Sequence, residues 1–574
     1  MIPCRSRFRC MVVVILLGLL CSSGIIVAGS ASTDTATPSR RTFGKGWLEY
    51  RTGFRVLFMQ GTPYEMGLQH GTLLKNELQQ LAKHLNDEPV QKSITGRIWE
   101  FFTDLYQRAV VISRALREVP QQYHDEMRGI AAGAGLDLET VLLLQYYYEA
   151  LGPRGTGIVK FVGAPVHDRV FHGYNLEAPW PGLLADQLTV LLYKPHDGQG
   201  FVSIGWPGLV GVVQGMNQSG LSLTYSAIIA GSAPTPPAIP GLILMREALQ
   251  HGAYVDEVYA TFATWPRSGS AIITAAATKD EPDALVIEYN AQRISQHLAA
   301  DDHLTTTAVF TTPALLPFSR IDNIVPENRR RRVDALLLDL MIHTPADFVA
   351  LLRDRHDADT GTDSFYNNGI SNPDVIASTV FHPKQQVFWV ARASDTAPAP
   401  FQQYIAFDLN GELVGKHQLS PAAIPASPLL EEAQGEALAL YRQAHALTVA
   451  DGAAVDWRRI AALLEQVVAI DPAAMPLYRL SEAYTHINRY DGAQEILLRL
   501  LQQEDTHPYW RKRALLALGG IYEQSHAYTP ARAAYEQALH IQIPAGPYLY
   551  EQGALDEAIN ELLSRLSTEL RSQQ

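Results

Sequence analysis

The residues best suited to chemistry lie in two short segments near the middle of the chain, Gly155-Thr156-Gly157-Ile158-Val159 and His172-Gly173-Tyr174-Asn175-Leu176-Glu177. Thr156 offers a hydroxyl group, which becomes a nucleophile when a base lies beside it. A thiol is not available, because the three cysteines (Cys4, Cys10 and Cys21) all lie in the N-terminal leader. Nucleophilic chemistry on this part of the chain therefore depends on Thr156.

The composition is that of a globular protein with more than one domain. The chain has 574 residues, of which 47% are apolar and 18% are charged, and this length allows two or more domains with a sizeable core. The net charge of −13 argues against a nucleic-acid partner, because phosphate binding requires clustered Lys and Arg. The one basic run, Arg329–Arg332, lies in a helical pattern and is interpreted as a solvated helix face.

The N-terminus predicts export. Three arginines precede an apolar stretch from Met11 to Gly29, and small residues follow it. This pattern indicates a signal peptide over residues 1–30, cleaved near Ser30, or an uncleaved membrane anchor. We therefore expect an exported protein, periplasmic or extracellular, that touches a membrane only through an uncleaved leader. A cleaved chain would contain no cysteine, so it would have neither a disulfide nor a thiol-ligated metal.

Composition and periodicity divide the remaining chain into four parts. Residues 31–42 are interpreted as a linker, 43–411 as a first domain, 412–432 as a second linker, and 433–574 as an all-helical region. The first domain has a helical part (43–154) and a part from residue 155 with short β-branched and aromatic runs separated by turns. The order of these elements predicts a layered α+β fold with antiparallel sheets.

The helical region contains an internal repeat. Leu480 and Tyr484 recur as Leu518 and Tyr522, with one constant offset. This spacing resembles tetratricopeptide repeats, which stack helical hairpins into a short solenoid. An ordinary antiparallel helix array is the alternative interpretation. Either structure offers a surface for a protein partner at residues 433–574.

Four sequence elements in one order resemble the isopenicillin N acyltransferase family of N-terminal-nucleophile hydrolases. They are Gly61-x5-Gly67-x2-His70-Gly71, Tyr123-x2-Glu126-x2-Gly129, the two segments at 155 and 172, and Trp206-Pro207-Gly208 with Gly215-Met216-Asn217-Gln218-Ser219-Gly220. The resemblance covers about residues 55–410. It implies an αββα sandwich, followed here by the tetratricopeptide-like helical array, and a hydrolase or acyltransferase acting on linear amide bonds.

In the family that the chain resembles, the precursor cleaves itself before a cysteine, and the freed α-amine serves as the base. An α-amine is less basic than lysine, and its attachment to the nucleophile removes orientational entropy. The resemblance makes Gly155-Thr156 the scissile bond and Thr156 both nucleophile and base. A second alignment, which fits at least equally well, places Gly155 at the cysteine position and leaves no nucleophile.

Other positions carry predicted roles from the same resemblance. Asn217 corresponds to an asparagine that donates to the oxyanion, and Glu177 keeps the charge of an aspartate. Tyr174 replaces the family's arginine, and it is assigned to substrate binding together with Asn175 and Trp206. A later asparagine of the family is missing near residues 309–313.

Two hypotheses follow from these residues. The first is an exported, self-cleaving amidohydrolase or acyltransferase for a small amide or acyl substrate. The second is a catalytically silent member that binds such a ligand, or that acts as a scaffold through its helical repeats. Neither requires a cofactor. The histidines show no ligand spacing, so no metal is expected, and His70 is interpreted as a capping or packing residue.

Overall fold

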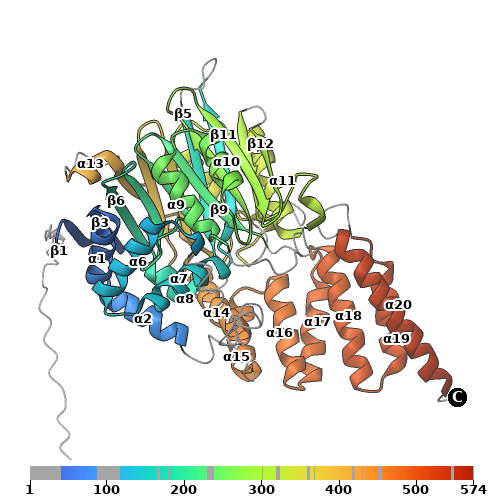
Figure 1. The fold of residues 1–574 in the computed structure, drawn as a ribbon. Helices are drawn as coiled ribbons and strands as arrows, with labels where there is room; N and C mark the ends of the chain where they lie inside the picture. The colour runs from blue at the N-terminus through green and yellow to red at the C-terminus, as the bar shows by residue number, and fades with distance from the viewer. Residues whose placement is uncertain are drawn as a thin grey trace, which may run out of the picture. The chain divides into compact units, whose positions relative to one another are not determined.

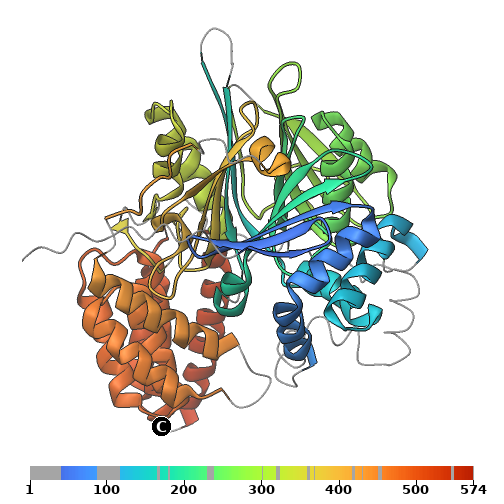
Figure 2. The same cartoon turned by 90° about the vertical axis from the view of Figure 1, so that its left-hand side faces the viewer.

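Two β-sheets packed face to face form the centre of the first domain (Figures 1 and 2). The computed structural model describes residues 40–86, 117–163, 169–178, 181–228, 238–299, 302–318, 324–357, 362–366, 369–415, 421–428, 431–449, 455–543 and 549–572. The predicted leader (1–30) and residues 87–116 of the predicted helical part lie outside these residues. Helices cover both outer faces of the sheet pair. The αββα sandwich implied by the resemblance is therefore confirmed.

The larger sheet has ten strands. Their order is β1 (Arg41–Phe43), β2 (Gly46–Arg51), β3 (Phe54–Gly61), β6 (Thr189–Pro195), β7 (Phe201–Gly205), β8 (Gln214–Asn217), β9 (Leu221–Ala227), β10 (Ser270–Ala277), β11 (Asp283–Asn290) and β12 (Ile294–Leu298). Strands β3 and β6 pair in parallel. The segment before residue 155 thus supplies three strands of this sheet, and β1 begins inside the predicted linker 31–42.

The smaller sheet has six antiparallel strands. Their order is β13 (His303–Thr306), β4 (Arg154–Val162), β5 (Arg169–Glu177), β16 (Val375–His382), β17 (Val387–Arg392) and β18 (Ile405–Asp408). A separate pair is formed by β14 (His356–Asp357) and β15 (Thr362–Asp363). Strands β4 and β5 form a hairpin with unbroken pairing from Arg154 to Val162, which places both chemistry-bearing segments side by side.

Two groups of helices enclose the sheets. The ten-stranded sheet is flanked by α1 (Pro63–Leu73), α2 (Lys75–Asn86), α6 (Gln121–Ala134), α7 (Leu138–Ala150), α9 (Gly241–His251) and α10 (Val255–Thr264). The six-stranded sheet carries α11 (Ile324–Asp339) and α12 (Pro345–Leu352). Shorter helices are α8 (Pro181–Gln187), η1 (Leu316–Phe318), η3 (Ala399–Phe401) and α13 (Leu409–Val414).

The glycines of the first two motif elements hold α1 against α6. A Cβ atom at Gly67 would overlap the Glu126 carbonyl oxygen, and one at Gly129 would overlap the Tyr64 carbonyl oxygen. The two helix backbones therefore approach more closely than any larger residue allows. His70 on α1 is fully buried, and its Nε2 accepts a hydrogen bond from the Gly208 backbone N–H (2.8 Å). Its role is one of packing and loop support.

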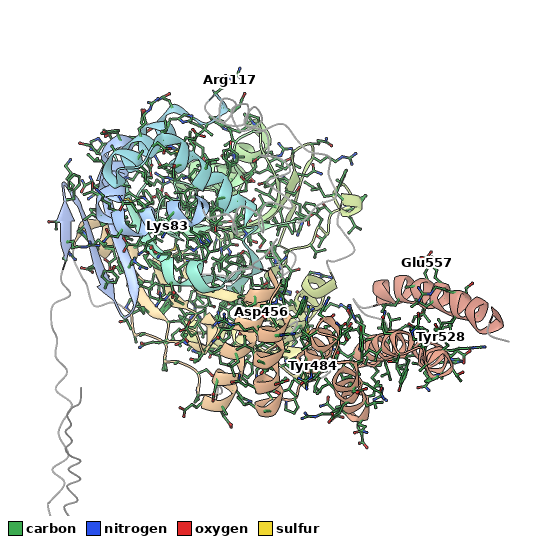
Figure 3. All side chains as sticks on the ribbon, turned by 90° about the horizontal axis from the view of Figure 1, so that it is seen from below. Lys83, Arg117, Asp456, Tyr484, Tyr528 and Glu557 are labelled. Atoms are coloured by element: carbon green, nitrogen blue, oxygen red, sulfur yellow. The ribbon has the colours of Figure 1, made fainter. Side chains whose placement is uncertain are left out.

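The C-terminal region is a row of antiparallel helices, in which Tyr484 and Tyr528 belong to successive hairpins (Figure 3). The helices are α14 (Glu432–Val449), α15 (Trp457–Ile470), α16 (Ala474–His486), α17 (Tyr490–Gln502), α18 (Pro508–Gln524), α19 (Tyr528–His540) and α20 (Leu549–Ser572). Leu480 and Leu518 are buried at equivalent places on α16 and α18. The repeat seen in the sequence thus corresponds to stacked hairpins. No helix among the described residues is long and apolar enough to span a bilayer.

The first helix of the array shares a hydrophobic cluster with the first domain. Phe365, Tyr366 and Phe401 belong to the same buried cluster as Leu438 and Tyr441 of α14. The rings of Tyr366 and Tyr441 meet edge to face, with centroids 4.9 Å apart. The contact between the first domain and α14 therefore has a continuous apolar core rather than only surface contacts.

Candidate active site

The pairing of β4 with β5 decides which way each residue of the first segment faces. Side chains alternate between the two faces of a strand. Ile158 packs in a cluster with Phe348 of α12, whereas Val159 packs with Ile272 and Val286 of the other sheet. Even-numbered residues of β4 therefore face the α11–α12 layer, and odd-numbered residues face the space between the sheets.

Thr156 faces the α11–α12 layer and is fully buried. Its Oγ1 has no hydrogen-bond partner among the described residues. The opposite residue on β5 is Asn175, whose amide group donates to the carbonyl oxygens of Leu352 (3.0 Å) and Ile370 (2.9 Å). Because these bonds tie β5 to the segments above it, Asn175 has a clear structural task, and its substrate-binding role stays a prediction.

Glu177 lies on the same face of the hairpin and forms a buried ion pair with Arg329 of α11. Asn372 also donates to Glu177 (3.0 Å). The interpretation of Arg329–Arg332 as a solvated face was wrong for Arg329, which is buried against Glu177, whereas Arg332 is partly exposed and bonds Asp354. An amphipathic pattern cannot reveal such partners, since they come from distant parts of the chain.

Gly155 faces the space between the sheets, and that space is already filled. A Cβ atom at this position would overlap the Asn175 carbonyl oxygen and would lie 3.1 Å from ring atom Cε2 of Tyr174. Tyr174 is fully buried, and its hydroxyl donates to the Tyr225 carbonyl oxygen (2.6 Å). The tyrosine ring thus stands where a side chain at position 155 would extend.

The Ser226 hydroxyl donates a hydrogen bond to the carbonyl oxygen of Gly155 at 3.4 Å. Ser226 Oγ lies 3.2 Å from the Tyr174 hydroxyl. A donor on this carbonyl would stabilise negative charge if the hydroxyl of Thr156 attacked it. At 3.4 Å the hydrogen bond is long and weak.

Asn217 and Trp206 lie away from this hairpin. The Asn217 amide donates to the carbonyl oxygens of Leu249 (2.8 Å) and Gly252 (2.7 Å), which closes the C-terminal end of α9. Trp206 is fully buried, stacks on Tyr148 with centroids 5.2 Å apart, and donates to the Leu184 carbonyl oxygen. The structure therefore brings Thr156, Asn175 and Glu177 to one face. Tyr174 lies on the opposite face of the hairpin, and Asn217 and Trp206 lie away from the hairpin.

Glu149 is a polar residue near the start of β4 that sequence reasoning missed. It lies in the last turn of helix α7, and its carboxylate accepts a hydrogen bond from the Gly241 backbone N–H (2.9 Å) and weaker ones from the Ser268 hydroxyl (3.4 Å). The Tyr225 side chain is also close enough to lower the pKa of Glu149. Burial raises the pKa of this carboxyl to about 7, although the residue keeps partial contact with solvent. A carboxyl that titrates near neutrality is typical of a functional site.

The raised pKa makes stability depend on pH in a defined direction. Between pH 4.5 and 7 the unfolded chain releases the Glu149 proton while the folded chain keeps it, so the free energy of unfolding falls as pH rises. The contribution of this residue is full below pH 4.5 and is lost by about pH 7, a loss of about 3 kcal/mol. Urea unfolding of wild type and Glu149→Gln across this range isolates the change, because glutamine mimics the protonated acid. A constant difference between the two proteins would contradict the prediction.

Comparison with known protein families agrees with this architecture. Residues 180–397 match the model of the acyl-coenzyme A:6-aminopenicillanic acid acyl-transferase family. The chain carries a domain of this family. Residues 453–518 match the tetratricopeptide repeat model, so the helical array is a tetratricopeptide array. The match to the acyl-transferase domain begins after β5, and it therefore does not include Gly155, Thr156 or Tyr174.

Curated relatives are about a quarter identical to this chain over the regions that match. An uncharacterized protein of Archaeoglobus fulgidus is 27% identical over 36% of the chain and 38% of its own length. The proteins dcd1A and dcd1B of Dictyostelium discoideum are 23% and 21% identical, and the matches cover 55% and 48% of their lengths. The chain thus spans about half the length of these relatives or less.

The solved structures that show a likeness to this chain include two groups. The first includes a Caenorhabditis elegans orthologue of N-acylethanolamine-hydrolyzing acid amidase (18% identity, TM-score 0.29, 40% of this chain and 93% of that one). It also includes a variant of conjugated bile acid hydrolase from Clostridium perfringens (11% identity, TM-score 0.32, 48% of this chain and 98% of that one). The second group contains MamA (19% identity, TM-score 0.17, 24% of this chain and 80% of that one).

Proposed function

We propose that this protein is a non-cleaving member of the acyl-transferase family that acts as a scaffold. In this proposal the acyl-transferase domain has no working nucleophile, and it binds rather than cleaves a small amide- or acyl-bearing ligand. The tetratricopeptide array recruits a protein partner. The observation that carries the proposal is the pair formed by Gly155 and Tyr174.

Gly155 has no side chain, and the Tyr174 ring occupies the space that a side chain at position 155 would need. A nucleophile that faces the space between the sheets needs a side chain at position 155, but the Asn175 carbonyl and the Tyr174 ring leave no room for one. Thr156 supplies a hydroxyl on the opposite face, where it is fully buried beneath the α11–α12 layer. A substrate would have to displace packed residues to reach it.

The array supports the scaffold part of the proposal. Tetratricopeptide arrays stack hairpins into a curved surface that suits a protein partner. Export through the leader at residues 1–30 stays a prediction, and it would place this scaffold outside the cytoplasm.

The test is the intact mass of the purified protein together with sequencing of its N-termini. Denaturing conditions are essential, because β1–β3 share a sheet with β6 and would hold two cleaved pieces together. The scaffold proposal expects one chain that runs unbroken through residues 155 and 156. A second N-terminus at Thr156 would overturn it.

The self-cleaving enzyme is the second candidate, favoured by the Ser226 hydroxyl on the Gly155 carbonyl and by the free hydroxyl of Thr156. In that case Thr156→Ala should abolish cleavage, and Ser226→Ala should slow it by a factor of about 100, the size of effect seen for one oxyanion donor. Thr305→Ala is a matched control, since Thr305 lies on the neighbouring strand β13.

Restoring a cysteine at position 155 should destabilise the protein and should not create an enzyme. Gly155→Cys adds volume at a filled site, so the free energy of unfolding should fall by about 1–3 kcal/mol. Urea unfolding measures the loss, and the intact mass reports any cleavage. Gly553→Cys is the control, because the space around Gly553 is open and its substitution should have little effect. A stable, cleaved Gly155→Cys protein would show that the site still has room for a nucleophile.

A further inference from the structure

Strand β12 is the last strand of the ten-stranded sheet, and it pairs there with β11 alone (Figure 1). An edge strand presents backbone N–H and C=O groups without a partner in the sheet, and such groups can pair with another chain. The sequence of β12, Ile-Ser-Gln-His-Leu, contains no Lys, Arg, Asp, Glu or Pro, which are the residues that commonly prevent such pairing. This edge therefore lacks the usual protection against a further strand.

The other edges of the two large sheets, within the described residues, are shorter or covered. Strand β1 has three residues and begins with Arg41. Helix α11 packs against the edge strand β13. Next to β18, Tyr404 exchanges two backbone hydrogen bonds with Ile424 (2.9 and 3.0 Å), so a further segment already lies beside that edge. The edge of β12 is thus the one most open to another strand.

The hydrogen bonds between β11 and β12 show which backbone groups of β12 point outward. Residues that face each other on antiparallel strands alternate between pairs that exchange backbone hydrogen bonds and pairs that do not. At the turn between the two strands, the N–H of Asn290 donates to the Arg293 carbonyl oxygen (3.0 Å). Every second residue after Arg293 must also bond β11, and within β12 these are Ser295 and His297.

The far end of the ladder agrees with this pattern, because the N–H of Ala299 donates to the Ala284 carbonyl oxygen (3.2 Å). The backbone N–H and C=O groups of Ile294, Gln296 and Leu298 therefore point away from β11. Among the described residues these groups have no backbone partner on the outer side. Both Gln296 and Leu298 are also exposed, the latter by 61%.

We propose that β12 pairs antiparallel with β12 of a second copy of this chain, about a two-fold axis at Gln296. In this register Gln296 exchanges backbone hydrogen bonds with the partner's Gln296, and Ile294 exchanges them with the partner's Leu298. All outward N–H and C=O groups of the two strands are then used. A two-fold contact of this kind is closed, so it produces a dimer rather than a fibre.

The side chains of β12 favour a second copy as the occupant. Gln296 lies opposite Ile287 of β11, which belongs to the core cluster under α10, so Ile294, Gln296 and Leu298 share the face that carries α10. In the dimer the exposed Leu298 lies opposite the partner's Ile294, about 5.5 Å away between Cα atoms, and each covers the other. The two Gln296 amides meet at the axis, where they can bond each other. No like charges face each other across the paired strands, and the contact does not depend on Gly155 or Thr156.

Sedimentation velocity of the full chain tests the proposal. The wild type should form a species of twice the monomer mass, with a Kd on the order of 1–100 µM, because one paired strand is a small interface. Gln296→Pro should remain a monomer at these concentrations, since proline removes the outward N–H at the axis. The fold should survive, because the Gln296 N–H is not part of the ladder with β11. An unchanged midpoint of urea unfolding, followed by circular dichroism, checks this point.

A charge exchange at the axis separates pairing from any effect on the fold. Gln296→Lys and Gln296→Glu each place like charges opposite one another, so each variant alone should dimerise about fivefold more weakly than wild type. An equimolar mixture of the two should regain the dimer, because the opposed charges then attract. Gln385→Lys in the exposed turn between β16 and β17 is the matched control and should dimerise like wild type.

Two results would overturn the proposal. One is a wild-type protein that stays monomeric up to about 500 µM, because even a small specific interface should associate at that concentration. The other is a dimer that none of the three Gln296 substitutions weakens, because its interface would then lie away from β12.

Discussion

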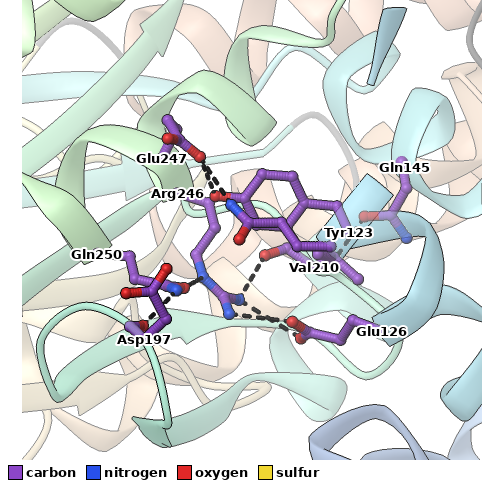
Figure 4. A network of polar contacts seen from close by, with 9 residues as sticks. Tyr123, Glu126, Gln145, Asp197, Val210, Arg246, Glu247 and Gln250 are labelled. Atoms are coloured by element: carbon purple, nitrogen blue, oxygen red, sulfur yellow. Dashed lines mark hydrogen bonds and ion pairs between the residues drawn. The ribbon is translucent and has the colours of Figure 1, made fainter. Parts of the chain in front are cut away.

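Replacing Arg246 by leucine should lower the free energy of unfolding by about 3–5 kcal/mol, because it leaves Glu126 as an uncompensated buried charge. Arg246 is 1% exposed, and it bonds the Glu126 carboxylate (3.0 Å) and the Val210 carbonyl oxygen (3.0 Å), as Figure 4 shows. Its guanidinium also lies 4.2 Å from the centre of the Tyr193 ring. Urea unfolding followed by circular dichroism measures the loss.

The double variant Arg246→Leu/Glu126→Leu is the control for charge. Replacing both partners of a buried ion pair by apolar residues is often close to neutral, so the double variant should regain most of the lost stability. If it is as unstable as the single variant, the cost comes from lost packing around Tyr193 rather than from the stranded carboxylate. A single variant that loses less than about 1 kcal/mol would contradict the prediction.

Phe401→Ala should lower the free energy of unfolding by about 3–5 kcal/mol and should affect both parts of the molecule together. Phe401 is 3% exposed, meets Phe365 edge to face with centroids 5.4 Å apart, and belongs to the cluster that includes α14. Because this cluster is shared, the acyl-transferase domain and the array should unfold in one transition. Circular dichroism and tryptophan fluorescence during urea unfolding should report the same midpoint.

The control for that prediction is Leu498→Ala, because Leu498 on α17 is 39% exposed and its truncation leaves no internal cavity. Two separate transitions, with the array unaffected by Phe401→Ala, would mean that the two parts fold independently. The shared cluster also explains why residues 433–574 are a poor choice as an isolated fragment. Without Phe365, Tyr366 and Phe401, the apolar face of α14 would be exposed to water.

The fold was predictable from sequence because its signals are local. The order of the four motif elements predicted the sandwich, and the constant offset between Leu480 and Leu518 predicted the stacked hairpins. The face on which Thr156 lies was not predictable, because it depends on which residue of β5 pairs with it. A shift of one residue in that pairing would send Thr156 to the space between the sheets.

The environment of Glu149 could not be predicted from the sequence, for another reason. Its partners Gly241 and Ser268 are far from it in the chain and come from separate segments. The same holds for the ion pair between Glu177 and Arg329. Such contacts follow from the packing of whole layers, so residue type alone cannot identify them.

The parallel pairing of β3 with β6 has a consequence for synthesis. Arg55 pairs with Thr189, so β3 has no neighbour on that side until about 130 further residues have left the ribosome. At about 5–20 residues per second this takes on the order of 10 s. During that time the apolar strand Phe54–Gly61 has only β2 beside it. A chaperone or the export machinery that holds the nascent chain would protect this strand from aggregation.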